Sequence, residues 1–199
     1  MRDENNNAFR RVVVEDAVRS MLRAIEPSLV ADYLRPGIRD TPRRVAEAFS
    51  EWFGGYAQDP AEVMRTFEDG AEQCNEMVVL TNIPVESHCE HHMAPFIGKA
   101  TVAYIPAGRI IGISKIARLV NIFAKRLQVQ ERLTNQIADA MLPTLLPKGV
   151  GVIITCEHMC MATRGVHTPG VKTTTSALRG NFFNDSTVRA EFLALHQKG

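Results

Sequence analysis

The stretch that decides the fold runs from Met77 to Pro106 and has the sequence MVVLTNIPVES-HCEHHMAPFI-GKATVAYIP. Its two outer segments are rich in β-branched and apolar residues, and this composition predicts two β-strands. The middle segment, residues 88–97, interrupts the pattern and predicts a loop between the strands. Five consecutive side chains in it, from His88 to His92, can each bind a metal ion or move a proton. The chain has 6 histidines in all, so the concentration of histidines here indicates chemistry at this loop.

A second cluster of the same residue types is CEHMC, Cys156 to Cys160, in another segment predicted to be a strand. Alternate side chains of a strand project to one face, so we expect Cys156, His158 and Cys160 on one side of the sheet. If this strand pairs near the loop of residues 88–97, thiolates and imidazoles converge, and zinc favours such a mixed set. The spacing alone leaves the choice of ligands open. Cys156 also suits a buried strand position, and Cys74 lies in a polar loop.

The first third of the chain is predicted to be helical. Apolar residues at helical spacing mark an amphipathic helix over roughly residues 12–26, after a loose polar tail over residues 1–10. Two more helices are predicted to follow, one capped by Thr41 and one by Asp59, each with a proline in its first turn.

The remainder returns to strands after a pair of helices. The segment Ser114–Pro147 carries two apolar stripes and predicts a helical hairpin broken near residues 128–130. Strands are predicted over residues 149–160 and 172–183, followed by a short helix capped by Asp185 or Ser186. The order of helices, two strands, two helices, two strands and a helix favours one α+β domain over a doubly wound sheet.

The composition limits the classes of function. The chain has 199 residues, of which 45% are hydrophobic, enough for one domain with a buried core. Its 23 basic and 22 acidic residues give a formal net charge of +1, which points to neither nucleic acid nor a membrane as the main partner. No apolar stretch approaches the ~18 residues that span a bilayer, and the polar N-terminus lacks a secretory signal, so we expect a cytoplasmic protein. In a reducing compartment, clustered Cys and His indicate metal binding or catalysis.

Other motif assignments are weaker. The segment GVHTPGVKTT from Gly165 resembles a Walker A loop, but it has one residue too many before Lys172 and a strand pattern follows it. A zinc deaminase would show His-x-Glu and then Pro-Cys-x-x-Cys; His88 and Glu90 supply the first half, and the second is absent. A purely structural zinc site needs four ligands without surplus histidines, whereas the candidates here exceed four. A non-catalytic binding module that keeps zinc for stability is a further alternative.

The sequence closely resembles the GTP cyclohydrolase I family in its bacterial zinc-dependent type. Ser87–His92, followed by Pro95 and Phe96, matches the family's S-x-C-E-H-H segment, and AKRLQVQERLT, Ala124–Thr134, matches its second motif. The blocks GISKIARLV, HMC…RGV and KTTTSALRG match in the same order, so the resemblance covers roughly residues 12–197.

The resemblance implies a T-fold, with an N-terminal helical region over residues 1–72 and a catalytic region over residues 73–199. The catalytic region would hold an antiparallel ββααββ unit and a C-terminal helix. Members form toroidal homodecamers of two pentamers, with the sheets joined into a barrel and active sites at subunit interfaces. The implied activity converts GTP and water to 7,8-dihydroneopterin triphosphate and formate, the first step of folate and pterin synthesis.

The resemblance also implies which residues form the centre of the site. Carried over by position, Cys89, His92 and Cys160 would bind one zinc ion per subunit, and His91 and His158 would act in catalysis. His88 departs from the family pattern, in which a neutral side chain is more frequent, and we expect it to face solvent.

For the guanine base, the resemblance implies contacts from Glu131 and Gln130. A carboxylate at Glu131 can accept hydrogen bonds from guanine N1–H and the exocyclic amine, whereas adenine would leave it unpaired. Without the resemblance, a solvated helix charge would be the simpler interpretation of Glu131.

For the triphosphate, positive charge is needed in one place. Lys115 and Arg118 lie three apart on a predicted helix and share a face, and Ser114 lies at the N-terminus of that helix, which favours anions. Arg164 follows the second cluster, and Arg44 is a further implied contact. These positions agree with the family positions.

Overall fold

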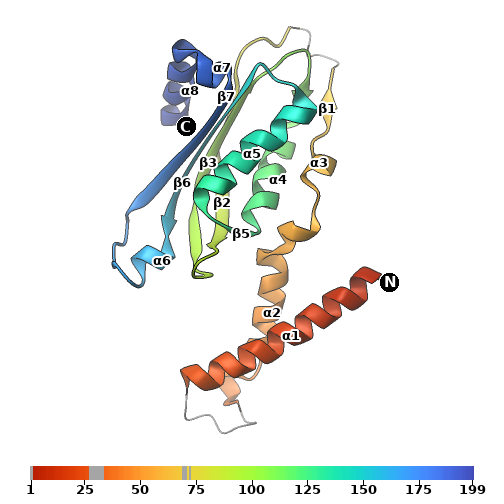
Figure 1. The fold of residues 1–199 in the computed structure, drawn as a ribbon, viewed down its shortest axis with the longest axis vertical. Helices are drawn as coiled ribbons and strands as arrows, with labels where there is room; N and C mark the ends of the chain where they lie inside the picture. Colours follow the sequence, from red (N-terminus) through yellow and green to blue (C-terminus); the bar gives the residue numbers. More distant parts are fainter. Residues whose placement is uncertain (1, 27–33, 69–70, 72) are drawn as a thin grey trace. The chain divides into compact units, whose positions relative to one another are not determined.

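The computed structural model describes residues 2–26, 34–68, 71 and 73–199, with side chains described from residue 10 onward. The chain divides into two compact units, Met1–Gly54 and Gly55–Gly199, whose elements are labelled in Figure 1. Within the described ranges, no helix is long and apolar enough to cross a membrane.

The N-terminal unit is helical, as predicted. Its elements are α1 (Arg2–Ile25), the 3-10 helix η1 (Pro36–Ile38) and α2 (Thr41–Trp52). The predicted loose tail is wrong for residues 2–10, which continue the helix and contain no glycine or proline to end it. The cap assigned to Thr41 is also wrong, because Thr41 is already helical and Asp40 occupies the N-cap position without a side-chain cap hydrogen bond.

The second unit contains the predicted strands and helix pair. Its elements are η2 (Gly54–Ala57), α3 (Pro60–Val63), β1 (Thr66–Phe67), β2 (Val78–Cys89), β3 (Pro95–Ile105), β4 (Ile110–Ile111), α4 (Ile113–Ala124), β5 (Leu127–Gln128), α5 (Gln130–Leu145), β6 (Gly149–His158), α6 (Met159–Ala162), β7 (Lys172–Gly180), α7 (Asn181–Asn184) and α8 (Ser186–Lys198). The break in the helical hairpin is confirmed, since β5 lies between α4 and α5.

The main sheet has five strands in the order β5-β2-β3-β6-β7. All its neighbouring pairs are antiparallel except the parallel pair of β2 with β5. A separate two-stranded sheet pairs β1 with β4. The helices α4 and α5 lie together along the main sheet in Figure 1. This is an α+β architecture, as predicted.

Strand alternation gives the sheet two apolar faces. Val102 and Ile154 belong to the larger core, which α4 and α5 complete. Their chain neighbours Ala103 and Ile153 belong to a second core, closed by Phe192 of α8 and by α7. Both faces of the central strands are therefore buried, which restricts the register of their pairing.

The caps and strand ends differ partly from the prediction. Asp59 caps α3 by accepting from Ala61 N at 2.9 Å, and Asp185 caps α8 by accepting from Thr187 N at 2.8 Å. The strand predicted to reach residue 183 ends at Gly180, which has a positive φ of 58° and leads into α7. Glycine adopts this conformation without the strain that other residues would carry.

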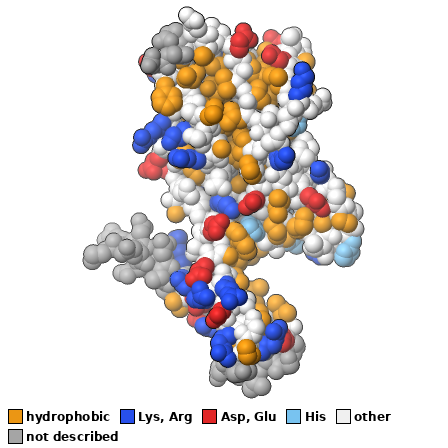
Figure 2. All heavy atoms as spheres, turned by 180° about the vertical axis from the view of Figure 1, so that it is seen from behind, with side chains coloured by type: hydrophobic (Ala, Val, Ile, Leu, Met, Phe, Trp, Pro, Cys, Tyr) orange, Lys and Arg blue, Asp and Glu red, His pale blue; other side chains and the backbone are white. Residues whose placement is uncertain are grey.

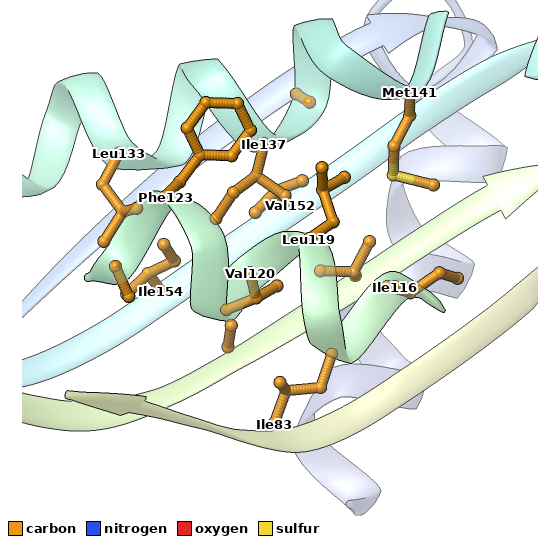
Figure 3. Packing of buried hydrophobic residues seen from close by; sticks show 14 of the residues in the cluster. Ile83, Ile116, Leu119, Val120, Phe123, Leu133, Ile137, Met141, Val152 and Ile154 are labelled. Carbon is orange, nitrogen blue, oxygen red and sulfur yellow. The ribbon is translucent and has the colours of Figure 1, made fainter. Parts of the chain in front are cut away.

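Packing between α4, α5 and the sheet forms the largest core. Figure 3 shows Leu119, Val120 and Phe123 of α4 between the strands and Leu133, Ile137 and Met141 of α5. Leu119 and Ile137 are fully buried, with 0% exposure.

Replacing Leu119 by Ala should therefore lower the free energy of unfolding by about 2–5 kcal/mol, since the lost methyl groups leave a cavity. Asn121→Ala changes an exposed residue of the same helix and should alter the free energy of unfolding by less than about 0.5 kcal/mol. Urea denaturation at equal protein concentrations measures both. Equal losses in the two variants would contradict the packing described.

Candidate metal centre and active site

The loop between β2 and β3 is a tight turn that returns His92 to Cys89. The Cys89 N–H donates to the Ala94 carbonyl at 2.9 Å, and the Met93 N–H donates to the Cys89 carbonyl at 2.8 Å. The His92 N–H also approaches the Cys89 carbonyl, at 3.3 Å. Met93 adopts a left-handed φ of 54°, which closes the turn. The predicted loop is confirmed but is shorter than expected, because β2 extends to Cys89 and β3 begins at Pro95.

Strand pairing brings the second cluster to this turn. Phe96, near the start of β3, is the Cα partner of His158, the last residue of β6. The chain then enters α6, so Cys160 lies in a helical turn. The prediction that Cys160 continues the strand is wrong, and strand alternation does not set its direction. Cys156 is buried in the core, where burial raises the pKa of its thiol to about 12.

Three ligand atoms meet beside the turn. One atom each from Cys89, His92 and Cys160 lie within 4.8 Å of one another. Two thiols and an imidazole are the donor set of metal sites that keep a fourth position open. Burial, followed by the adjacent Cys89, raises the pKa of the Cys160 thiol. A bound cation would favour both sulfurs as thiolates. The residues fit a metal ion, and the group can hold one.

Two of the predicted site residues border this group. Nη1 of Arg164 lies 3.2 Å from Nε2 of His92. His91 is exposed, with its Nδ1 3.8 Å from the Cys89 sulfur and its Nε2 3.9 Å from the Glu90 carboxylate. Both residues therefore lie next to ligands of the metal-binding group.

The ring of His158 has two contacts, one with its flat face and one with its Nε2 atom. It stacks on Phe96 with ring centroids 4.6 Å apart and planes at 9°. Its Nε2 lies 2.8 Å from Oε1 of Gln130. Burial lowers the pKa of His158, and the charge of Glu131 opposes that shift.

Several contacts that hold the ligand loop were missed from the sequence. The Glu90 carboxylate pairs with Arg132 of α5, and the Glu90 N–H donates to the Gln128 carbonyl at 3.0 Å. Arg132 also donates to the Gln128 side chain at 3.1 Å. Glu90 and Arg132 are 42 positions apart, so no local pattern predicts their pairing. The stacking of Phe96 on His158 was missed for the same reason.

His88 differs from the expectation. It is buried, with 8% exposure, so the prediction that it faces solvent is wrong. It pairs with Leu127 between β2 and β5, an arrangement that only the tertiary structure determines. Burial, followed by the charge of Lys125, lowers the pKa of His88.

Of the predicted triphosphate residues in the second unit, Arg164 borders the metal-binding group, whereas the three residues of α4 lie away from it in the same chain. Ser114, Lys115 and Arg118 lie in the first half of α4, whose other end leads into β5 beside Cys89. At about 1.5 Å per residue, the helix from Ser114 to its end spans roughly 15 Å. Arg44 belongs to the N-terminal unit.

The fold and the site together define a class of protein: an α+β protein whose Cys/His group can hold a metal ion, with an ordered histidine close to it in the chain. A family model described as GTP cyclohydrolase I matches residues 14–197. The chain belongs to the GTP cyclohydrolase I family.

Individual relatives agree over most of their length. The chain is 58% identical over 161 residues to GTP cyclohydrolase 1 of Janthinobacterium sp. (strain Marseille), covering 81% of each chain. It is 52% identical over 189 residues to that of Mycolicibacterium vanbaalenii, covering 94% of this chain and 91% of the relative. The solved structure of the archaeosine synthase QueF-Like in the apo form aligns with a TM-score of 0.42 and 19% identity, covering 52% of this chain and 93% of that one. That likeness is too weak to support a conclusion.

The geometry predicts which cysteine matters for metal binding. Cys160→Ala should remove most of the bound metal, because only two ligands of the group remain. Cys156→Ala, the matched change in the nearby core, should keep the metal content of the wild type. Elemental analysis of purified proteins measures both. Metal loss from Cys156→Ala with retention in Cys160→Ala would contradict the assignment.

Proposed function

We propose that the protein is a zinc-dependent GTP cyclohydrolase I, which converts GTP and water to 7,8-dihydroneopterin triphosphate and formate. The observation that carries the proposal is the meeting of Cys89, His92 and Cys160 next to His158 in a member of this family. Zinc is the proposed metal, one per subunit, because its preference for mixed thiolate and imidazole ligands fits this set.

The reaction opens the imidazole ring of guanine at C8, a poor electrophile. When bound, zinc would supply a nucleophile by lowering the pKa of a water molecule to about 7. We assign to His158 the protonation of guanine N7, which makes C8 more electrophilic. We assign to His91 proton transfer on the ribose side, for which its exposed position beside Cys89 is suited.

Recognition of the substrate would use negatively charged and positively charged side chains. Glu131 would accept hydrogen bonds from guanine, and its charge acts on His158, which supports a position near the base. Ser114, Lys115, Arg118, Arg164 and Arg44 form the proposed set for the triphosphate. Gln130 enters the substrate set by resemblance alone.

The location of the α4 residues supports an assembly in which neighbouring copies complete the site. We propose the homodecamer of two pentamers that the resemblance implies, with sheets joined into a barrel and residues 73–199 as the catalytic region after the helical residues 1–72. Apolar side chains exposed on one chain support such contacts, among them Ile97 at 52% and Phe183 at 64%. Figure 2 shows apolar side chains gathered on one face.

Incubating the metal-loaded protein with GTP should release formate and yield a fluorescent pterin after oxidation. Chelation of the metal should stop both, because the water nucleophile is lost. Liquid chromatography and a formate assay measure the products. Intact GTP after prolonged incubation would instead support a non-catalytic binding module.

His158→Ala should reduce turnover by about 10²–10⁴-fold or more, because a positioned proton donor is lost. GTP should still bind, since the metal ligands and basic residues remain. His196→Ala removes a histidine of α8 that bonds Thr101, and should keep most of the activity. Near-normal turnover in His158→Ala would refute the role assigned to this residue.

A further inference from the structure

The side-chain amide of Gln130 is enclosed, and both its nitrogen and its oxygen have hydrogen-bond partners. Gln130 is 1% exposed and begins α5. Its nitrogen donates to the Ile154 carbonyl at 3.0 Å and the Thr173 carbonyl at 2.9 Å, and approaches Thr175 Oγ1 at 3.2 Å. Backbone carbonyls only accept hydrogen bonds, so this end of the amide is the NH₂ group. The opposite end, which faces His158, is therefore the oxygen.

Two threonine hydroxyls support this orientation. Thr134 donates its single hydroxyl proton to the Gln130 backbone carbonyl at 2.7 Å. In the 2.6 Å contact between Thr134 and Thr175, Thr175 must therefore donate. Thr175 has no second hydroxyl proton, so towards the Gln130 nitrogen it can only accept. Each hydrogen bond in this network thus has one allowed direction.

The network determines which nitrogen of His158 carries the proton. Oε1 of Gln130 accepts only, so Nε2 of His158 donates across the 2.8 Å contact. In the neutral ring the proton is then on Nε2, and Nδ1 has the free lone pair. The stacking on Phe96 fixes the plane of the ring. The ring therefore presents one defined nitrogen for proton exchange.

We propose that Gln130 is a positioning residue, which fixes His158 in the Nε2–H tautomer and leaves Nδ1 as the nitrogen that takes up a proton from solvent and then donates it to the substrate. The inference rests on the proposed function for the identity of the substrate, but not for the tautomer. It differs from the substrate contact implied by resemblance. A direct contact from the Gln130 amide nitrogen to guanine would require breaking its buried hydrogen bonds to backbone carbonyls, which is unfavourable without replacements.

The tautomer can be measured without any turnover. Solid-state ¹⁵N NMR of the zinc-loaded, histidine-labelled protein distinguishes protonated from unprotonated ring nitrogens, and His158→Ala identifies the signals of this residue. We expect the neutral form of the ring to be protonated at Nε2 and unprotonated at Nδ1. A neutral His158 protonated at Nδ1 would overturn the proposal even if the protein converts GTP. Absence of GTP conversion would overturn the proposed function and leave this measurement valid.

Kinetics separate positioning from substrate contact. Gln130→Met keeps the length of the side chain and removes the acceptor, so kcat should fall by about ten- to a hundredfold, part of the effect of a positioned proton donor. KM for GTP should change by less than about threefold if the wild-type contact is to His158 only. Gln197→Met is the matched control, because it makes the same change at an exposed residue of α8. Its kcat should stay within about twofold of the wild type.

A binding measurement completes the test. In the His158→Ala background, where turnover is lost, adding Gln130→Met should leave the Kd for GTP within about threefold. A Kd raised about tenfold or more, or a raised KM with unchanged kcat, would show that Gln130 contacts the substrate and would overturn the positioning role. Zinc content and circular dichroism confirm that each variant is folded. If Gln130→Met does not fold, the NMR measurement on the wild type decides.

Discussion

The antiparallel register of β3 with β6 is the constraint on which the site depends. It pairs Phe96 with His158 and so brings two Cys/His clusters, far apart in the chain, to the same end of the sheet. A shift by one residue would move every side chain of a strand to the opposite face, and both faces are apolar cores. Gly98 adds a local restriction opposite Cys156, because a Cβ there would lie 1.9 Å from the Thr155 carbonyl oxygen. The register is therefore fixed by packing along the strands and by close backbone approach near the site.

The site lies where the core gives way to the surface. Cys89 and Phe96 are buried at this border, whereas His91 and His92 on the turn are exposed. Their positions at this border explain why the histidines of the site differ in exposure. His158 is partly enclosed, and burial lowers its pKa. The polar chemistry is thus placed at the end of the sheet without interrupting either core.

Much of the architecture follows from local patterns in the sequence. Strand composition on both sides of CEHH, the apolar stripes of α4 and α5, and the acidic caps at Asp59 and Asp185 each reflect short-range preferences, and the structure contains these features. The predictions that were wrong, and the contacts that were missed, depend on tertiary structure. Burial of His88 depends on β5, the direction of Cys160 depends on a helical turn, and the pairing of Glu90 with Arg132 joins distant segments. Sequence spacing contains no information on these contacts, so the ligand set could be narrowed only by resemblance.

The metal-binding group and the proton-transferring group are held by different parts of the fold. The ligands are placed by the β2–β3 turn and by α6, both short elements at the end of the sheet. His158 is oriented by a ring from β3 and by an amide whose own bonds reach carbonyls of β6 and β7, which pair in register next to it. Neither Phe96 nor Gln130 belongs to the Cys89, His92 and Cys160 group. The orientation of the histidine is therefore a property of the sheet and of α5, and the bonds that set it do not require the metal.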